Sequence, residues 1–437
     1  MKSGRYKPYE QYKDSGIEWL GEIPEHWDSA NISKLFKINA GGDLQVNYFS
    51  EIKTQKHCFP IYTNANDKNA IYGYSCKNNY EANTITVSGR GDIGFAVFRD
   101  HPYDAIIRLL VLSPIKQQHC KFFSYYINDV IDFRVESSAI GQLSTNQIAP
   151  YKVVFPHFRE QTQIANFLDH ETAKIDTLIE KQKRLIKLLK EKRQAVISHA
   201  VTKGLNPDAP MKDSGVEWLG EVPEHWVIKN YRYSSKIYRG KFGHRPRNDP
   251  SLYDGEYPFI QTGDIARAQK KITSYTQTLN EKGKSISQRF PAGSLVMAIA
   301  ANIGDTAILD FEAYAPDSVV GFKPNSDIFI DFLKYSLMAS LPALEKTSTQ
   351  STQANLNIDR IGAVKSIFPP LKEQFIIVSV LDKQERQYQS IEKKAIDAIT
   401  LLQERRTALI SAAVTGKIDV RDWVAPDNDN TPGGEAL

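Results

Sequence analysis

The chain of 437 residues contains little cysteine and no long hydrophobic segment. Its three cysteines, Cys58, Cys76 and Cys120, form no CxxC pair, which argues against a disulfide scaffold and a structural zinc site. No run of about 18 apolar residues is present to span a membrane. The first residues, MKSGRYKPYEQYKDSG, lack the apolar stretch of a secretory signal. We therefore expect a cytoplasmic protein that does not associate with membranes.

The sequence also lacks recognisable catalytic and cofactor motifs. Gly89–Gly94 (GRGDIG) matches the GxGxxG pattern of dinucleotide-binding loops, but the alternating FAVFRD that follows predicts a strand instead of the required helix, so we interpret the segment as a hairpin. Gly283–Ser285 (GKS) resembles the end of a phosphate-binding loop, but Thr278 stands where its first glycine belongs. No HExxH, GxSxG, zinc-type Cys/His cluster or amino-methyltransferase Asn/Asp-Pro-Pro-Tyr/Phe motif occurs. We predict no catalytic residue, no bound metal and no cofactor.

What the sequence does contain is an internal duplication. Asp14–Trp27 (DSGIEWLGEIPEHW) and Asp213–Trp226 (DSGVEWLGEVPEHW) differ only by Ile-to-Val exchanges, and we refer to these segments as the first and second box. The box histidines, His26 and His225, are expected to pack beside the neighbouring tryptophans instead of binding a metal. Each box is followed by a second repeat: FPHFREQTQIANFLDHE from Phe155 matches FPPLKEQFIIVSVLDKQ from Phe368, and EKRQAVISHAVTKG from Glu191 matches ERRTALISAAVTGK from Glu404.

The duplication divides the chain into box, variable region and helix, and then the same order again. The variable regions share little sequence and each has the size of a small domain, so one architecture is expected to present two different surfaces. The tail is rich in Pro, Gly, Asn and Asp and is expected to be disordered. The predicted segments are 1–27 with the first box, the domain 28–154, the helix 155–205, the linker 206–226 with the second box, the domain 227–367, the helix 368–419 and the tail 420–437.

Both helical repeats carry apolar residues at heptad spacing, which predicts that the two helices pack on each other as a coiled coil. About 40 residues at 1.5 Å per residue would make each helix ~60 Å long, enough to act as a spacer. A solvated hairpin without a measuring role is the alternative. The basic run Lys181–Arg193 suits a solvated helix face or, less well, a surface along phosphates. The predicted packing residues are Ile164, Leu168, Ile175, Leu178, Leu185, Leu189 and Val196 in the first helix, and Ile377, Leu381, Ile391, Leu402 and Leu409, with Tyr388, Ala395 and Ala398, in the second.

The net charge of +4 permits a nucleic-acid partner, and the local charge points to one. Tyr231–Arg247 (YRYSSKIYRGKFGHRPR) has basic residues interleaved with aromatic ones and no acidic residue. This composition suits a loop that follows phosphates and offers guanidinium groups to guanine edges. A solvated basic strand pair is the alternative interpretation. The candidate DNA-binding residues of this segment are Arg232, Lys236, Tyr238, Arg239, Lys241, Arg245 and Arg247.

The first variable region is nearly neutral, so its candidates are polar loops: Tyr62–Tyr74, Ser88–Asp92 and Ser137–Gln147. Lys346–Asn357 is the counterpart of the last loop in the second region. Asn and Gln side chains can read adenine edges and Arg can read guanine, although Asn-rich loops are also ordinary turns. The candidate residues are Asn64, Asn66, Arg90, Gln142, Ser144, Thr145 and Asn146 in the first region and Thr352, Gln353 and Asn355 in the second.

With its WLGEIPEHW-type box, its FPP-x-x-EQ helix entrance and its two variable domains, the sequence resembles the specificity subunits of type I restriction-modification systems over nearly its whole length. The first entrance departs from the pattern, because His157 and Phe158 stand where the second copy has Pro370 and Leu371; this leaves the start of that helix less certain. The resemblance implies an α+β fold: two pseudo-symmetric target-recognition domains of mixed strands and short helices, separated by two long helices that form an antiparallel coiled coil.

The resemblance also implies a function without catalysis. Each target-recognition domain would read one half of a bipartite double-stranded DNA site, and the helices would set the gap. Implied partners are adenine-methylating modification subunits, docked on the helices and boxes, and a restriction subunit that translocates and cleaves DNA. Because the two domains differ in sequence, we expect an asymmetric target. The alternatives are a standalone enzyme, a coiled-coil adaptor that binds only protein, and a specificity subunit of a system without a nuclease.

Overall fold

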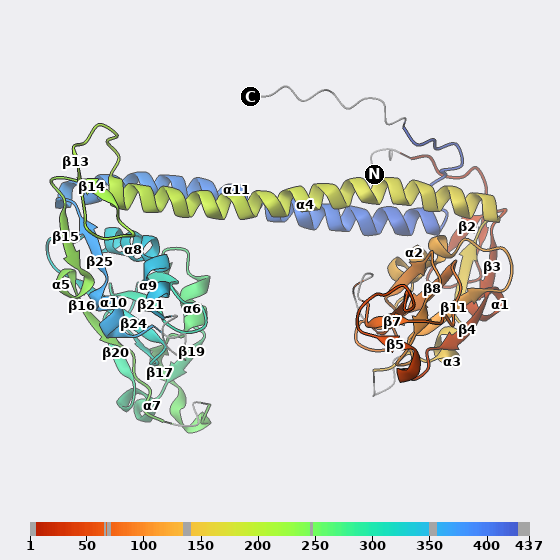
Figure 1. Ribbon diagram of the computed structural model, residues 1–437, viewed down its shortest axis with the longest axis horizontal. Helices are drawn as coiled ribbons and strands as arrows, with labels where there is room; N and C mark the ends of the chain where they lie inside the picture. The colour runs from red at the N-terminus through yellow and green to blue at the C-terminus, as the bar shows by residue number, and fades with distance from the viewer. Residues whose placement is uncertain are drawn as a thin grey trace. The chain divides into compact units, whose positions relative to one another are not determined.

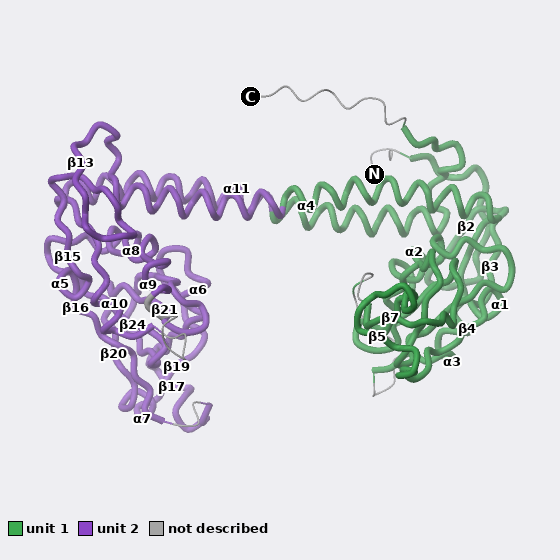
Figure 2. Tube along the Cα trace, in the orientation of Figure 1, with its two compact units in different colours: residues 1–182, 396–437 green, residues 183–395 purple. Residues whose placement is uncertain are grey.

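The computed structural model describes residues 6–64, 67, 71–133, 141–244, 248–348 and 356–426. Two compact units divide the chain: unit 1 contains residues 1–182 and 396–437, and unit 2 contains residues 183–395 (Figure 2). Each unit therefore combines one variable region with a stretch of both long helices. Among the described residues, none of the helices combines the length and the hydropathy that a membrane span requires.

Unit 1 contains a mixed α+β domain whose main sheet has the strand order β4-β11-β8-β9. A second sheet has the order β10-β6-β7-β5, and two short pairs, β1-β2 and β3-β12, complete the strands of the described part. The strands are β1 (Tyr12–Asp14), β2 (Glu22–Pro24), β3 (Asp28–Asn31), β4 (Phe36–Ala40), β5 (Phe49–Ser50), β6 (Phe59–Tyr62), β7 (Gly73–Ser75), β8 (Thr84–Val87), β9 (Ala96–Arg99), β10 (Asp104–Ala105), β11 (Leu110–Pro114) and β12 (Lys152–Phe155). Its helices are α1 (Ile32–Leu35), η1 (Val46–Tyr48), α2 (Cys120–Asp129) and α3 (Thr145–Ile148).

Unit 2 repeats this plan with more strands. Its main sheet has the order β16-β24-β21-β22-β18, its second sheet β19-β17-β23-β20, and its short pairs are β13-β14 and β15-β25. The strands are β13 (Met211–Asp213), β14 (Glu221–Pro223), β15 (Val227–Asn230), β16 (Ser235–Arg239), β17 (Tyr253–Phe259), β18 (Lys271–Ile272), β19 (Gln277–Leu279), β20 (Gln288–Phe290), β21 (Leu295–Ala298), β22 (Thr306–Leu309), β23 (Ala313–Ala315), β24 (Val319–Pro324) and β25 (Lys365–Phe368). Its helices are α5 (Tyr231–Ser234), η3 (Pro250–Leu252), α6 (Thr262–Arg267), α7 (Glu281–Ser285), α8 (Ile330–Ala339), α9 (Leu341–Ser348) and α10 (Ile358–Ala363).

The long helices are α4 (Phe158–Lys203) and α11 (Leu371–Val414), drawn side by side in Figure 1. Both begin at the same position of the duplicated entrance, so the departure at His157 does not move the start of the first helix. The helix pair is antiparallel within each unit. In unit 1 Asp176 pairs with Arg406 at 3.0 Å, while Ile164 and Ile410 share one core.

The same arrangement holds in unit 2. Lys190 lies 3.6 Å from Glu392, and three residues further along α4 Arg193 lies 2.6 Å from Glu385, earlier in α11. Advancing along one helix therefore means moving back along the other, which is the antiparallel packing that the resemblance implied.

Most of the predicted helix-packing residues do lie on the inner face of the helix pair, and three do not. The stripe that includes Leu168, Ile175, Leu189 and Val196 lies on the inner face, as do Ile164, Ile377, Leu381, Leu402 and Leu409. Leu178, Leu185 and Ile391, however, are exposed, at 46%, 39% and 42%. Ala398 is half-buried, like Leu189, Val196, Leu402 and Leu409.

The cause of this error is a shift of one residue in the second stripe of each helix. The inward residues are Ala165, Thr172, Ile179, Ile186, Arg193 and Ala200 in α4, and Val378, Glu385, Glu392, Ile399, Arg406 and Ala413 in α11. Several of them are polar and form the interhelical ion pairs described above. Because the prediction followed hydrophobic spacing alone, it placed Leu178, Leu185 and Ile391 in the seam, each one position before the residue that points inward.

Three other expectations can be compared with the structure. Gly89–Gly94 does connect the antiparallel strands β8 and β9. Gly283–Ser285 lies inside the short helix α7, not in a phosphate-binding loop. The disorder expected from residue 420 onward is contradicted at its start, because Val420 is buried in the core of unit 1 and the Trp423 ring packs 5.5 Å from that of Phe167. The remaining residues 427–437 lie outside the described part.

Candidate nucleic-acid interface

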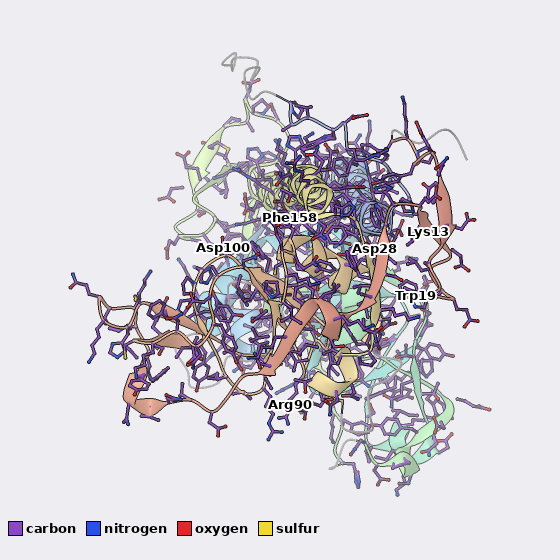
Figure 3. All side chains as sticks on the ribbon, turned by 90° about the vertical axis from the view of Figure 1, so that its right-hand side faces the viewer. Lys13, Trp19, Asp28, Arg90, Asp100 and Phe158 are labelled. Atoms are coloured by element: carbon purple, nitrogen blue, oxygen red, sulfur yellow. The ribbon has the colours of Figure 1, made fainter. Side chains whose placement is uncertain are left out.

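In unit 1 the loop between β8 and β9 presents Arg90 to solvent. Gly91 and Gly94 have φ of +72° and +87°, which lets the chain turn tightly on either side of residues 92 and 93. The Arg90 guanidinium donates to Oε1 of Gln142 from Nε at 3.3 Å and from Nη2 at 2.9 Å. Figure 3 shows Arg90 on the opposite side of unit 1 from Phe158, where α4 begins. Two of the predicted site residues, from loops far apart in sequence, thus meet on one surface.

Asn64 holds this loop in place. Its Oδ1 accepts from the backbone N–H of Gly89 at 2.7 Å and of Arg90 at 3.3 Å, and its Nδ2 donates to the carbonyl oxygen of Ile107 at 2.7 Å. Both ends of the amide are therefore engaged by the protein backbone. We assign Asn64 to positioning Arg90, in place of the direct base contact that its residue type suggested.

A second arginine, Arg108, lies beside this loop and was not among the predicted residues. Ile107 and Arg108 are consecutive exposed residues with φ of +53° and +59°. A β-branched residue in this region is an outlier, and strain of roughly 1–3 kcal/mol per residue is found mostly at functional sites. The carbonyl of Ile107 binds Asn64, so Arg108 stands next to the Arg90 loop. Hydropathy and composition do not distinguish Arg108 from other surface arginines. Its distinguishing feature is the positive φ, which is a property of the folded backbone.

In the described part of the third predicted loop, residues 141–147, several polar side chains form hydrogen bonds within the domain. Ser144 caps α3, and its backbone N–H and hydroxyl both donate to Oε1 of Gln147 at 2.8 Å. This capping box fixes the start of α3. Thr145 is half-buried on its first turn, and Asn146 is exposed. Of the predicted residues here, Gln142 and Asn146 are the ones placed to reach a ligand.

In unit 2 the basic segment is not a single loop. Its described part includes α5 and the edge strand β16, and most of its aromatic side chains point inward, whereas Tyr233 is 68% exposed. Tyr231 and Phe242 are buried in the core, and the Tyr238 hydroxyl hydrogen-bonds Ser294 at 2.8 Å. Burial raises the pKa of Tyr238. The Tyr238 ring thus packs against the core of the sheet and is half-buried, and its contact with DNA stays a prediction.

The basic residues of this segment do face solvent. Lys236 and Lys241 are exposed, and β16 pairs with β24 so that Lys236 lies directly opposite Lys323. Like charges directly opposite on a sheet repel each other, so this pair costs stability unless an anion lies over it. Lys323 was not predicted, because its place beside Lys236 depends on the strand register.

Two arginines of the segment are held by backbone carbonyls. Arg232 donates to Gly362 at 3.1 Å and to Asp359 at 3.2 Å, both in α10. Arg239 donates from Nε to the carbonyl oxygen of Asp317 at 2.8 Å. These bonds fix the direction of each guanidinium and leave part of each fork exposed. We name Arg232, Lys236, Arg239, Lys241 and Lys323 the basic strip.

The two units therefore display different chemistry on equivalent elements. Unit 1 has Arg90 at the tip of the β8–β9 hairpin, whereas the corresponding hairpin of unit 2, between β21 and β22, has Ala300 and Ala301. The other predicted contacts, Asn66, Arg245, Arg247, Thr352, Gln353 and Asn355, lie outside the described residues. Within the described part, no cluster of three or more His, Cys, Asp or Glu side chains could hold a metal ion.

The duplicated motifs have a structural task of their own. In unit 1 Glu160, on the first turn of α4, accepts from the Trp27 indole at 3.0 Å and contacts Nε2 of His26 at 2.8 Å. In unit 2 Glu373 binds Trp226 at 2.9 Å and His225 at 2.8 Å in the same way. The box is thereby fastened to the start of each long helix. His225 packs beside Trp226 as expected, with ring centroids 6.4 Å apart, whereas the His26 ring lies 5.6 Å from that of Tyr9. Both histidines also contact the carboxylate.

The glutamine of the entrance motif links the helix to the domain. Gln161 donates to the carbonyl oxygen of Pro156 and to Gln118, and accepts from the backbone of His119 at 2.9 Å. Gln374 repeats the pattern with Pro369, Asp327 and Phe329. Each variable domain is therefore tied to its helix by the same buried amide.

Comparison with known proteins gives a consistent result. The family model described as "Type I restriction modification DNA specificity domain" matches twice, at residues 24–188 and 239–401. The Escherichia coli EcoDI specificity subunit is 21% identical over 94% of this chain and 93% of its own length.

Other relatives match over a shorter region. The Mycoplasma pneumoniae protein named as type I specificity subunit S.MpnORF89P is 31% identical over 38% of this chain, and the match spans about half, 49%, of that relative. A chain solved in a study of complex assembly and conformational transition of the type I R-M system shares the fold, with a TM-score of 0.68 at 12% identity over 91% of this chain and 99% of that one.

Proposed function

Because the chain belongs to the type I restriction-modification DNA specificity family, we propose that it is the non-catalytic subunit that selects the DNA sequence for a methyltransferase/endonuclease complex in the cytoplasm. This proposal rests on one observation: the DNA specificity domain matches the chain twice, and the two matched regions carry different surface residues. An enzyme would need catalytic side chains arranged around a substrate. An adaptor that binds only protein would not account for the basic strip.

Each unit would read one half of a bipartite site. In unit 1 the Arg90 and Arg108 guanidinium groups suit guanine, and the Gln142 and Asn146 amides suit adenine. In unit 2 the basic strip suits phosphates, which contribute affinity without sequence information. Because the equivalent hairpins carry Arg90 in one unit and alanine in the other, the two halves of the target should differ.

The long helices would set the number of bases between the half-sites and receive the modification subunits. The apolar residues that the helix seam leaves outside support this docking. They include Leu178 and Leu401 in unit 1 and Leu185 and Leu188 in unit 2, with exposures of 39% to 66%. Leu185 and Leu188 are three residues apart on α4, so they share one helix face and form a small apolar patch that another protein could cover. The partners would be adenine methyltransferase subunits and, where the system includes one, a restriction subunit that translocates DNA.

Co-expression with the neighbouring methyltransferase gene tests this function, with modified adenines mapped across the host genome by single-molecule sequencing. The expected result is one motif of two unlike halves around unspecified bases, absent when the chain is omitted. A complex that assembles but modifies no defined motif would reduce the chain to a scaffold.

A further inference from the structure

Unit 2 contains a cavity of about 350 Å³ at the junction of its box and its long helices. The lining is mostly apolar and includes Leu205, Trp226, Ile376 and Ile377, with the Glu373 carboxylate at its edge. The same Glu373 fastens the box to α11, as described above. The cavity therefore lies against one of the two duplicated fastening points.

The equivalent place in unit 1 is filled by Tyr9. Its hydroxyl donates to Oε1 of Glu160 at 2.7 Å, and its ring lies 6.0 Å from Trp27 and 5.6 Å from His26. The chain's C-terminal segment covers the ring, with the Arg421 guanidinium 5.1 Å above it. Glu160 thus serves three donors: an indole, an imidazole and a phenol.

Among the described residues of unit 2, Glu373 has an indole and an imidazole partner but no phenol. The β1–β2 and β13–β14 hairpins have the same register, with Tyr12 opposite Pro24 and Met211 opposite Pro223, so Asp208 is the residue that corresponds to Tyr9. Asp208 is exposed and has no ring to place in the cavity. As a result the Glu373 side chain is 39% exposed, against 10% for Glu160.

We propose that this cavity receives a tyrosine side chain from an extended segment of a partner protein, with the phenol donating to Glu373. The inference rests on the proposed function, in which the partner is a modification subunit. The Tyr9 contacts of unit 1 show the chemistry that such a junction accepts: an aromatic ring against tryptophan and one hydroxyl donor to the carboxylate. The lining also contains Lys203, but its ammonium donates to the carbonyl oxygens of Leu219 and Glu221. The apolar walls and the Glu373 carboxylate therefore favour an aromatic ring with a hydroxyl donor over a phosphate.

The two units would consequently engage their partners differently. Unit 1 supplies Glu160 with its own Tyr9, and the hollow beside that ring is lined largely by polar residues such as Glu10, Glu25 and Arg421, whereas unit 2 would take a tyrosine from outside. A modification subunit docked on unit 2 would therefore make a contact that the subunit docked on unit 1 does not make.

Photo-crosslinking in the assembled complex tests the proposal. The photoreactive residue replaces Ile376 as Ile376→benzoylphenylalanine, and the chain is co-purified with the modification subunits in a complex that methylates DNA. The matched control is Gln163→benzoylphenylalanine, at the equivalent position of unit 1, where the side chain contacts the backbone of Val420. The control should attach to the chain's own residues near 420–423.

The expected product at Ile376 is a crosslink to a tyrosine-containing segment of the modification subunit. Asp208→Tyr, which supplies the phenol from the chain itself, should lower this crosslink at least tenfold, whereas Asp208→Asn should leave it unchanged. A complex that methylates DNA but gives no crosslink at Ile376, or one to DNA or to a second copy of the chain, would overturn the inference. If the wild-type chain and the modification subunits form no complex at all, the proposed function fails first.

Discussion

Lys236 on β16 and Lys323 on β24 are direct cross-strand partners, so two exposed ammonium groups lie on the same face of one sheet edge. Neighbouring like charges destabilise a sheet in isolation. A phosphate bound between the two ammonium groups would turn this destabilising repulsion into a net attraction. The pair is therefore the part of the basic strip whose arrangement is most difficult to explain without a nucleic-acid ligand.

Replacing both lysines, as Lys236→Ala with Lys323→Ala, should weaken DNA binding across all sequences. Each lost phosphate contact should lower the slope of log affinity against log salt by about 0.9. Fluorescence anisotropy of the complex at several salt concentrations measures this slope. Lys393→Ala, a single-charge control on the exposed face of α11, should not change the slope. An unchanged slope in the double variant would remove the basic strip from the interface.

Arg90→Ala should relax the target at one position of one half-site. A bidentate contact to guanine contributes about 1–3 kcal/mol of discrimination, and its loss should appear as degenerate modification at that base. Adenine mapping of the variant complex measures this, with the other half-site as an internal control. Asn64→Ala should produce a weaker effect at the same position, because it only releases the loop. Degeneracy in both half-sites would contradict the assignment of Arg90 to one half.

Glu160→Ala should destabilise the chain more than Glu373→Ala. Glu160 is nearly buried and serves Tyr9, Trp27 and His26, so its loss leaves buried donors unpaired at a cost of about 1–3 kcal/mol each. Around Glu373, which is more exposed, water can replace the carboxylate. Urea denaturation of the two variants compares the effects. Equal losses, or a larger loss for Glu373→Ala, would contradict the asymmetry of the two junctions.

The one-residue shift of the helix stripe can be tested at two adjacent positions. Ile179 is 7% exposed and Leu178 is 46% exposed. Ile179→Ala should lower the free energy of unfolding by about 2 kcal/mol or more, whereas Leu178→Ala should change it by less than about 0.5 kcal/mol. The same denaturation measurement distinguishes them. The reverse order would restore the stripe expected from hydrophobic spacing.

Asp129, at the end of α2, should make unit 1 less stable as the pH rises. Burial raises the pKa of this carboxyl from 3.8 to about 6. Between these values the folded state binds the proton more tightly than the unfolded state, so stability is lost as the pH increases through that window. Asp129→Asn should therefore raise the melting temperature at pH 7 and have little effect at pH 3.5. A variant that is equally stabilised at both pH values would contradict this.

Much of the fold followed from the duplication, because repeated boxes and entrances mark the same junction twice whatever lies between. The second helix stripe could not be predicted from hydropathy, since residues such as Thr172, Arg193 and Glu385 face inward as hydrogen-bonding or charged groups. For the same reason Arg108 and Lys323 were missed: backbone strain and strand register place them, and neither property is visible in a single sequence. The burial of Tyr231 and Phe242 could not be predicted either, because an aromatic residue looks the same in sequence whether it stacks on a base or fills a core, and Tyr233 of the same segment is exposed.

The most direct test of the central claim is to make the two halves of the chain alike. A chain in which residues 227–367 replace residues 28–154 would carry the second domain at both positions on the same helices. Mapped with its methyltransferase, this chain should modify a symmetric target in which the second half-site of the wild-type motif appears twice in inverted orientation. If a folded and assembled chain of this kind still modified the wild-type asymmetric target, the claim that each domain reads one half of the site would be contradicted.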